Sequence, residues 1–492
     1  MSKFTRRTFL TGTVATAASL ATWRRAYGAN DAVRVAVVGC GGRGKAHIDE
    51  YSGTDKGGSP KVPGVRIVAL CDCDEDHLNA EAGKLDKKGI KVDKYTDLRK
   101  LLEDKNIDAI SIATPNHQHS LQAIWAMLAG KDVYCEKPIS HNVWEGRKVV
   151  EVQKKTGRIC ATGTQCRSSV GLMEAIKWVQ DGNLGKIQHV RGLCYKYRPS
   201  IGHVDGPQPI PKGLAGAGYD IWCGPAKTTQ PLMRKNLHYD WHWVWDTGNG
   251  DLGNQGIHQM DIARWVLGED KLSPRVFSVG GRFGYEDDGE TPNTMFVFHD
   301  YKPAPLIFEV RGLPGKPPKE GEKPKMDEYK GAEIGVVAKC EHGNLVITSY
   351  EKAHVLDEDG KIVKEFKGGG NHFKNFIDAV NSRKQESLAS PILQGHLSSA
   401  LCHTGNISIR LGAKSTQEAI REKLKDNFDA QETFENMCMH LKVNRVDLGK
   451  TKATMGEFLT MDGVAETFSG NMDASKMLTR EYRAPYSIPE KV

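Results

Sequence analysis

The most informative residue in this chain is Lys137, which stands in the run Glu136-Lys137-Pro138 after an apolar, strand-like segment. In a parallel sheet, ligands bind in the crevice at the carboxyl ends of the strands, so a lysine there faces a bound molecule. The proline that follows fixes the turn and restricts the lysine's own backbone. A lysine at a strand end is more often a solvated surface residue, but the motifs upstream and downstream favour a catalytic role.

A glycine pattern upstream is the first of those motifs. The spacing Gly39-x-Gly41-x-x-Gly44 follows the apolar run 33–38 and precedes a predicted helix. Such glycines allow a tight turn, a close approach to a pyrophosphate and close helix–strand packing, with the phosphate charge at the helix N-terminus. The pattern therefore predicts a dinucleotide site. The predicted cofactor contacts in this loop are Gly39, Gly41, Gly42, Arg43 and Gly44.

An aspartate at the end of the second predicted strand, Asp72, favours NAD over NADP. A carboxylate here accepts hydrogen bonds from the adenosine ribose and repels a 2′-phosphate. Asp72 lies further from the glycines than usual, because the polar loop 53–64 intervenes. A helix N-cap within Asp72-x-Asp74 is the alternative interpretation.

A third polar cluster lies in residues 248–261, where glycines crowd around Asn254, His258 and Asp261. Asn254 and His258 are four residues apart, so on a helix they share a face that Asp261 also reaches. A histidine with a pKa near neutrality is a natural base for removing an alcohol proton. A lone histidine is usually structural, but the recurring polar residues favour His258 as the catalytic base.

Tryptophans alternate at Trp241, Trp243 and Trp245, which on a strand places them on one face. Such a face offers an aromatic platform for a sugar ring, and plain core packing is an equal alternative. The nearby His238 and His242 suggest a metal only weakly, because no third ligand is evident in the sequence, and we predict no metal.

These residues need a fold that brings them together, and the first third of the chain alternates predicted strands and helices. This alternation predicts an α/β fold with a doubly wound parallel sheet of the Rossmann type. The strands are expected at 33–38, 66–71, 107–113, 132–135 and 159–163, and the helices at 45–51, 97–103, 120–129 and 145–156.

The pattern changes after about residue 165, where predicted strands follow one another with fewer helices between them. We expect a C-terminal α+β domain with a large, mostly antiparallel open sheet and a surface loop at 312–330. Its strands are expected at 187–197, 276–283, 295–299, 306–310, 333–338 and 344–349, and its helices at 170–181, 371–382 and 393–411. The predicted segments are a leader (1–28), a dinucleotide domain (29–160), a second domain (161–412) and a C-terminal extension (413–492).

The composition excludes several classes of protein. The 492 residues are 39% hydrophobic and 26% charged, and the formal net charge is +7. Five of the basic residues and none of the acidic ones precede Asp31, so the leader carries most of this net charge. No basic stripe interleaved with aromatics is present, so no nucleic-acid partner is expected. The eleven cysteines are scattered without zinc spacing, and their odd number argues against a disulfide framework.

The first 28 residues are predicted to be a targeting leader rather than part of the fold. Arg6-Arg7 stands in a twin-arginine pattern, and a weakly apolar stretch at 9–23 is too short and polar to span a membrane. Such leaders are typical of proteins exported folded, so we expect a periplasmic or exported protein that folds, with its cysteines free, before export. A basic disordered N-terminus is the alternative.

A family resemblance rests on four motifs that occur in a fixed order. They are the glycine fingerprint, Ala113-Thr114-Pro115-Asn116-His117-x-His119, Glu136-Lys137-Pro138 and His258-x-x-Asp261-x-x-Arg264. Over about residues 33–412 the chain resembles the family of glucose–fructose oxidoreductase, inositol dehydrogenase and the rhizopine-catabolism protein. The resemblance implies an NAD(P) oxidoreductase acting on sugars or polyols. Lys137 would orient the reacting hydroxyl and His258 would take its proton.

The resemblance also implies which residues touch the ligands. The cofactor contacts would include Thr114, Pro115, Asn116, His117, Glu136 and Lys137. The substrate contacts would include Lys137, Arg167, Tyr195, Trp241, Asn254 and His258. The substrate would be a small carbohydrate, and the C-terminal sheet would mediate homo-oligomer contacts.

One departure from the family affects the predicted reaction. Members often carry an aspartate four residues before the histidine, whereas this chain has Asn254. Free NAD is also scarce outside the cytoplasm, which favours a tightly held, recycled cofactor. The sequence therefore leaves three alternatives: an exported NAD-dependent oxidoreductase, an NAD-dependent glycosidase that oxidises its sugar transiently, and a noncatalytic sugar-binding relative.

Overall fold

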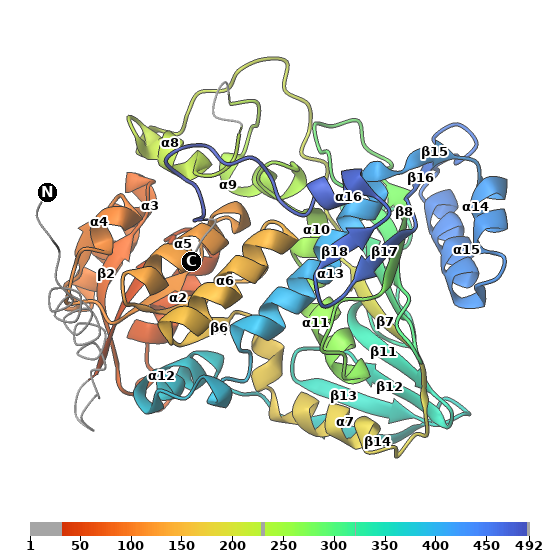
Figure 1. The fold of residues 1–492 in the computed structure, drawn as a ribbon, viewed down its shortest axis with the longest axis horizontal. Helices are drawn as coiled ribbons and strands as arrows, with labels where there is room; N and C mark the ends of the chain where they lie inside the picture. Colours follow the sequence, from red (N-terminus) through yellow and green to blue (C-terminus); the bar gives the residue numbers. More distant parts are fainter. Residues whose placement is uncertain (1–31, 228–231, 320, 490–492) are drawn as a thin grey trace, which may run out of the picture.

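The computed structural model of the chain describes residues 32–227, 232–319 and 321–489. Two sheets dominate it: a parallel sheet with its helices at one end of the molecule and a larger mixed sheet at the other (Figure 1). The predicted leader lies outside the described residues.

The first sheet is the predicted Rossmann sheet, with strand order β3-β2-β1-β4-β5-β6 and all neighbours parallel. Its strands are β1 (Val33–Val38), β2 (Val65–Cys71), β3 (Asp93–Tyr95), β4 (Ala109–Ile112), β5 (Asp132–Cys135) and β6 (Cys160–Thr162). The helices between them are α2 (Gly42–Ser52), α3 (Glu75–Lys87), α4 (Leu98–Leu101), α5 (His119–Leu128) and α6 (Val143–Thr156). The predicted fold class is confirmed for this part.

Helix α3 was not predicted, because its sequence is polar. Its fold depends on the Asp74 carboxylate, which accepts hydrogen bonds from the amides of Asp76 and His77, and on the buried face of Leu78 and Leu85. An N-cap of this kind typically contributes about 1 kcal/mol. The helix begins at Glu75, three residues after Asp72, so it fixes the rim of the crevice at the end of β2.

The second sheet is mixed and mostly antiparallel, as predicted, with β7 and β10 its one parallel pair among the described strands. Its strands are β7 (Ile187–Tyr195), β8 (Arg275–Gly281), β9 (Thr294–His299), β10 (Leu306–Arg311), β11 (Ile334–Cys340), β12 (Gly343–Ile347), β13 (Lys352–Leu356), β14 (Ile362–Lys367), β15 (Ala413–Ser415), β16 (Ala453–Met455), β17 (Leu459–Asp462) and β18 (Thr467–Ser469).

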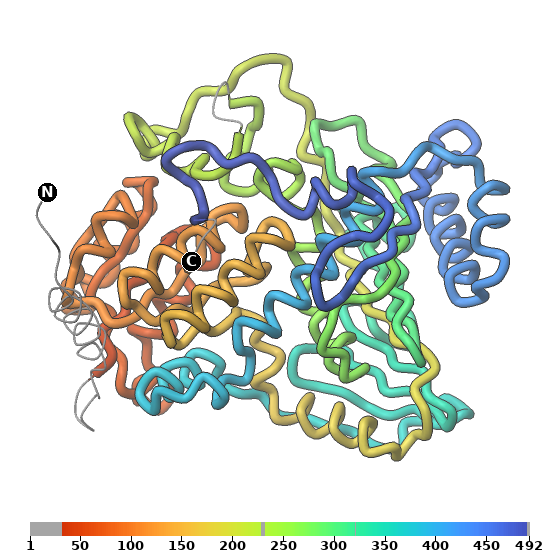
Figure 2. Tube along the Cα trace, in the orientation of Figure 1, coloured from red at the N-terminus to blue at the C-terminus, as the bar shows by residue number. Residues whose placement is uncertain are grey.

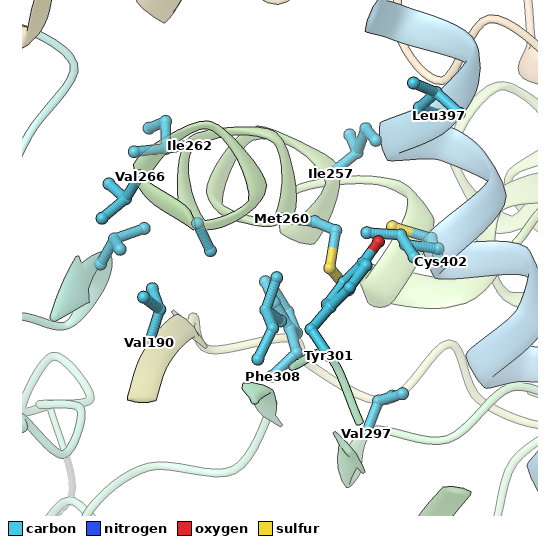
Figure 3. Close-up of a cluster of buried hydrophobic side chains, with 14 of the residues drawn as sticks. Val190, Ile257, Met260, Ile262, Val266, Val297, Tyr301, Phe308, Leu397 and Cys402 are labelled. Atoms are coloured by element: carbon cyan, nitrogen blue, oxygen red, sulfur yellow. The ribbon is translucent and has the colours of Figure 1, made fainter. Parts of the chain in front are cut away.

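The main core of the second domain lies between this sheet and two helices, α11 (Gly256–Leu267) and α13 (Ile392–Leu411). Figure 3 shows Ile257 and Met260 of α11 directed toward Phe308 of the sheet and toward Leu397 and Cys402 of α13. Burying apolar side chains of this size contributes about 1.5–3 kcal/mol each. The position of α11, and with it of His258, is therefore fixed by the core.

The opposite face of the sheet is covered by the chain's own C-terminal extension. Phe434 and Leu441 of α15 (Phe428–Val443) pack with Phe277, Phe296 and Ile307, and α14 (Gln417–Leu424) adds to the same cluster. Homo-oligomer contacts through this sheet stay a prediction. The part of the sheet face that packs against α15 is covered by the same chain, so a second copy does not contact it.

Two segments from later in the chain pack against the Rossmann domain, which the predicted domain boundaries did not include. Helix α12 (His372–Ser382) returns to the Rossmann core, where Phe373, Phe376 and Ile377 pack against Val33 and Val35. The last described segment runs back over the Rossmann helices beneath the insert that joins β7 and β8 (Figure 2), and Arg480 and Arg483 bond to main-chain oxygens on both sides.

The remaining helices are α7 (Val170–Gln180), α8 (Gly218–Cys223), α9 (Leu237–Asp240), α10 (Gly250–Gly253) and α16 (Met472–Lys476). In the part of the chain that the structure describes, none of the helices combines the length and apolarity that crossing a bilayer requires.

Candidate active site

A cavity of about 370 Å³ lies at the carboxyl ends of the Rossmann strands, beneath the insert between β7 and β8. The glycine loop and Asp72 line one part of it. Lys137 lines the same cavity, together with Trp241, His242 and Asn254 from the second half of the chain. The elements predicted to hold a dinucleotide and those predicted to perform chemistry therefore share one cavity.

The glycine loop has the geometry that a pyrophosphate needs. A Cβ atom on Gly44 would lie 1.7 Å from the carbonyl oxygen of Gly39, and Gly39 itself has a φ of +87°. Helix α2 begins at Gly42 without a side-chain cap, and Gly41, Gly42 and Arg43 line the cavity. The backbone N–H groups of an uncapped helix N-terminus attract phosphate, so this loop fits the dinucleotide.

Asp72 lies at the rim of the cavity, as predicted for a residue that contacts the adenosine ribose. Its carboxylate accepts hydrogen bonds from the amides of Cys40 at 2.6 Å and Asp74 at 2.9 Å. Burial raises the pKa of Asp72, and these two amides oppose that shift. The carboxylate thus connects the glycine loop to the start of α3.

Lys137 is half-buried, and its Nζ donates a hydrogen bond of 2.9 Å to the main-chain oxygen of Asn254. Burial lowers the pKa of the Lys137 ammonium, and the charge of Glu136 only partly offsets this effect. A lysine with a lowered pKa in a cavity is a candidate for proton transfer and for orienting a hydroxyl.

Glu136 was predicted to contact the cofactor, and in the structure its carboxylate also anchors the glycine loop. Arg43 Nε donates to it at 2.7 Å, and His47 Nε2 lies 3.1 Å from the same oxygen. Burial alone would raise the pKa of Glu136, but Arg43 and His47 outweigh it and hold the pKa well below its usual range. Glu136 lines the cavity as a charged group that is already paired.

Three of the four residues predicted in the loop after β4, Thr114, Pro115 and Asn116, line the cavity. The buried Asn116 donates to Asn249 Oδ1 at 2.8 Å, while its own Oδ1 has no partner among the described residues. Asn249 was not singled out in the sequence, although it lies in the glycine-rich run.

The prediction for His117 is wrong, because its ring does not line the cavity. Its Nε2 lies 3.0 Å from the Trp222 main-chain oxygen and its Nδ1 3.3 Å from that of Thr247, so the ring ties the Rossmann loop to the insert. His119 has a similar role that the sequence did not reveal: its ring nitrogens lie 2.7 Å from the main-chain oxygens of Pro138 and Thr114. These rings position the loops that carry the site.

Asn254 and His258 do not share a helix face as predicted. Asn254 lies between α10 and α11, and glycines at 250, 253 and 256 weaken helix continuity there. The side chain of His258 is buried, and it does not line the cavity. Burial, followed by the charge of Lys137, lowers the pKa of His258 well below its usual value, so the prediction of a near-neutral pKa is wrong.

Arg167, predicted to bind substrate, is instead part of a buried ion pair. Its guanidinium donates to the carboxylate of Asp261 at 2.8–3.0 Å, and Ser398 donates to the same carboxylate at 2.7 Å. Asp261 therefore holds α11 in place through this ion pair, and it does not act together with His258 on a ligand. A buried charge is retained when it is paired in this way.

Tyr195, predicted to bind substrate, also lies outside the cavity. Its hydroxyl donates to Glu309 Oε2 at 2.9 Å, and the guanidinium of Arg311 lies 4.4 Å from the centre of its ring. Alternation along β7 directs this side chain to the face of the sheet opposite α11. No local sequence pattern indicates this pairing, because Tyr195 and Glu309 lie on strands far apart in the chain.

The predicted strand with alternating tryptophans is wrong, because Trp241–Trp243 form a 3₁₀ turn after α9. Trp241 still lines the cavity, and its ring stacks on that of His242 with 3.6 Å between the ring centres. The His242 side chain satisfies the main-chain oxygen of Tyr239 at 2.6 Å, which favours a turn at this point.

His238 lies beside Asp74 and His77 rather than beside His242, so potential metal ligands that the sequence did not bring together do meet. His238 Nε2 is 2.9 Å from Asp74 Oδ2, and the other Asp74 oxygen accepts the amides that begin α3.

Comparison with known proteins agrees with this architecture. Residues 33–164 match the profile described as "Oxidoreductase family, NAD-binding Rossmann fold", and residues 173–292 match the one described as "Oxidoreductase family, C-terminal alpha/beta domain". Inositol 2-dehydrogenase from Salmonella paratyphi B is 29% identical over 246 residues, which are 50% of this chain and 57% of that enzyme. The match therefore spans little more than half of the relative.

Two further proteins are similar over different extents. A glycosyl hydrolase family 109 protein from Streptomyces niveus is 33% identical over 165 residues, which are 32% of each chain. The crystal structure of the WlbA dehydrogenase from Bordetella pertussis, in complex with NADH and UDP-GlcNAcA, matches with a TM-score of 0.53 and 20% identity, covering 75% of this chain and 94% of that one. At this identity the structural likeness concerns the fold.

Proposed function

Since the chain belongs to the Gfo/Idh/MocA family of oxidoreductases, we propose that it oxidises a hydroxyl group of a sugar, a polyol or a sugar derivative with NAD. One observation carries the proposal: the glycine loop, Asp72 and the half-buried Lys137 line one cavity. At Gly39 and Gly44 the backbone leaves no room for a Cβ, so the loop lies close against the N-terminus of α2, which would hold the pyrophosphate. When bound, NAD supplies a hydride acceptor.

Lys137 performs the positioning step in this proposal. Its Nζ is held by the Asn254 main-chain oxygen and has further hydrogens to donate to a substrate hydroxyl. An ammonium at that oxygen stabilises negative charge as the hydroxyl loses its proton. The cavity beyond it offers the aromatic ring of Trp241, which suits a neutral carbohydrate.

The test uses the purified mature protein. Any bound nucleotide is released and identified by mass spectrometry, and the protein is then incubated with neutral sugars, polyols and aryl glycosides without added NAD. We expect bound NAD and an oxidised product, or a rise in absorbance of reduced cofactor. Failure to bind NAD in any preparation contradicts the proposal.

A second candidate function, an NAD-dependent glycosidase, is supported by the similarity to the glycosyl hydrolase family 109 protein. In such an enzyme oxidation of the sugar is transient, and the glycosidic bond breaks by elimination without net redox change. Asn254, in place of the aspartate often found in dehydrogenases of the family, fits this alternative. Release of the aglycone without accumulation of reduced cofactor distinguishes it from the first function.

We expect the protein to bind NAD more tightly than NADP. The substitution Asp72→Ser should reduce the ratio of the two dissociation constants by about tenfold, or ~1.4 kcal/mol. The reason is that the carboxylate at the end of β2 repels a 2′-phosphate. Titration of the nucleotide-free protein with both nucleotides measures the ratio of dissociation constants. Asp76→Ser, at an exposed position in the first turn of α3, is the matched control. Equal or tighter binding of NADP by the unsubstituted protein contradicts the prediction.

We further propose that the protein is exported folded and loaded with cofactor, and that Arg6-Arg7 direct it. The double substitution Arg6→Lys, Arg7→Lys should leave the full-length precursor in the cytoplasm, because twin-arginine signals are read through these side chains. Cell fractionation with immunoblotting measures the retained precursor. Lys3→Arg, which preserves the charge of the leader, is the control, and unchanged export of the double variant contradicts the proposal.

A further inference from the structure

We propose that Asp74, His77 and His238 bind a zinc ion that joins the insert between β7 and β8 to the Rossmann domain. Asp74 is the N-cap of α3, His77 lies in the first turn of that helix, and His238 lies in α9 of the insert. One ligand atom from each residue lies within 4.8 Å of the other two, and among the described residues no other group of three acidic, histidine or cysteine side chains does so. The inference does not depend on the proposed oxidation.

The spacing of the three side chains fits a tetrahedral ion. Zinc binds imidazole nitrogen and carboxylate oxygen at about 2.0–2.2 Å, so neighbouring ligand atoms of a tetrahedral site lie about 3.4 Å apart. His238 Nε2 lies 2.9 Å from Asp74 Oδ2, and the rings of His77 and His238 have 4.5 Å between their centres. Side-chain rotations that move each ligand atom by about 1 Å or less therefore bring the three to zinc distances, with the fourth position left to water.

The start of α3 orients the Asp74 carboxylate for this role. Its Oδ1 accepts hydrogen bonds from the amides of Asp76 at 3.0 Å and His77 at 3.3 Å, which leaves Oδ2 directed to His238. Hydrogen bonds of this kind to a ligating carboxylate hold metal ligands in place. Asp74 is also buried, and a buried charge is stabilised by a charged partner or a cation.

Apolar packing holds the histidine of the insert close to the Rossmann ligands. Leu237, next to His238, is buried in a cluster of insert residues, and Cys73, next to Asp74, packs against the same cluster. A Cβ on Gly213 would lie 2.0 Å from Asp74 Oδ1, so the backbone of the insert also approaches the carboxylate directly. The ligands therefore meet through packing that does not require the ion, and such preorganisation favours binding.

The donor set selects the kind of cation. Two imidazoles and one carboxylate suit zinc, whereas magnesium and calcium prefer sites made of oxygen. Asp72 Oδ2 lies 4.0 Å from His77 Nδ1, so a second carboxylate adds negative charge beside the site. Asp72, His77 and His238 all line the cavity, and a zinc ion would therefore fix the wall of the cavity at the end near Asp72.

A hydrogen bond from His238 to Asp74, without an ion, is the alternative explanation of the contact. The substitution His238→Gln separates the two explanations, because the glutamine amide can donate to the carboxylate but does not replace an imidazole as a zinc ligand. The substitution His77→Gln tests the third ligand and leaves the residues of that hydrogen bond in place. Asp74 is not substituted, because it is also the cap of α3.

The test uses purified protein without a histidine tag, stripped of metal with a chelator and titrated with zinc sulfate. Calorimetry measures the affinity and the number of ions bound per chain, and mass spectrometry measures the metal retained after dialysis. Melting temperatures are recorded with and without zinc. His203→Gln is the matched control, since His203 is an exposed histidine of the same insert that also lies beside a carboxylate, that of Asp288.

We expect one zinc ion per chain in the unsubstituted protein and in His203→Gln, and a higher melting temperature for both when zinc is present. His238→Gln and His77→Gln should each weaken zinc binding by at least about 10–100-fold, the usual cost of losing even an outer contact of a metal site.

The inference is overturned if the unsubstituted protein binds less than one zinc ion per chain, or if both variants bind zinc as tightly as the control. In that case the hydrogen bond between His238 and Asp74 alone explains the contact. If His238→Gln melts early without zinc, the zinc affinity of the folded His77→Gln protein decides the question. A protein that binds zinc as expected but no NAD contradicts only the proposed function, so the two failures are distinguishable.

Discussion

Replacing Lys137 by methionine should lower the rate of cofactor reduction by about 10²–10⁴-fold and leave NAD binding nearly unchanged. Methionine preserves the length and apolar body of the side chain but cannot donate to a hydroxyl. Lys137 is half-buried and lines the cavity, and its Nζ is held at 2.9 Å by the Asn254 main-chain oxygen, so a single positioned donor is lost. Single-turnover kinetics and a nucleotide titration measure the two quantities separately.

The matched control for this variant is Lys131→Met, at the opposite end of the same strand. Lys131 is buried, burial lowers its pKa as it lowers that of Lys137, and its Nζ donates to the main-chain oxygens of Asp104 and Ile107. Losing it leaves those oxygens without that donor, so the melting temperature should fall while the rate per folded molecule is kept. A Lys137→Met protein that turns over normally removes Lys137 from the mechanism.

Gly44→Ala should weaken NAD binding by at least about tenfold, or ~1.4 kcal/mol, and destabilise the protein by about 1–3 kcal/mol. A Cβ at this position would lie 1.7 Å from the Gly39 carbonyl oxygen and 2.7 Å from its carbon, so α2 must move away from the loop after β1. That movement displaces the helix N-terminus that would hold the pyrophosphate. Calorimetric titration with NAD and thermal unfolding measure the two effects.

Gly83→Ala is the matched control, since Gly83 lies within α3 of the same domain and a Cβ there meets no atom within 4 Å. An alanine in an open helical position should stabilise the protein by about 0.5–1 kcal/mol and leave NAD binding unchanged. If Gly44→Ala behaves like Gly83→Ala, the loop tolerates displacement and the assignment of its third glycine is incorrect.

The Rossmann sheet, the glycine loop and the strand-end positions of Asp72 and Lys137 follow from sequence alone. Each depends on a pattern within a short stretch of chain: an apolar run that must be buried on both faces, glycines at fixed spacing, and a polar residue directly after a strand. The topology of parallel strands then places all the strand ends at one edge. These local patterns, together with the rule that parallel strands end at one edge, therefore suffice to predict this half of the site.

The other half of the site was decided by contacts between residues far apart in the chain. Arg167 is removed from the cavity by Asp261, and Tyr195 by Glu309, and neither pairing leaves a local signal. Helix α3 was missed because its stability comes from a cap rather than from hydrophobic periodicity. Similarly, α12 joins the Rossmann core although it lies far along the sequence.

The histidines show the same division most clearly. Sequence spacing identified His258 as a polar residue in a glycine-rich run, but the core beneath α11 determines that its side chain is buried. His242 stands among tryptophans that suggested a strand, and the turn that directs it into the cavity exists because its own ring satisfies the Tyr239 carbonyl. The sequence by itself determined which chemical groups are present and where the strand ends meet. Only tertiary packing, which balances burial against hydrogen bonding over the whole chain, decided which imidazole lines the cavity.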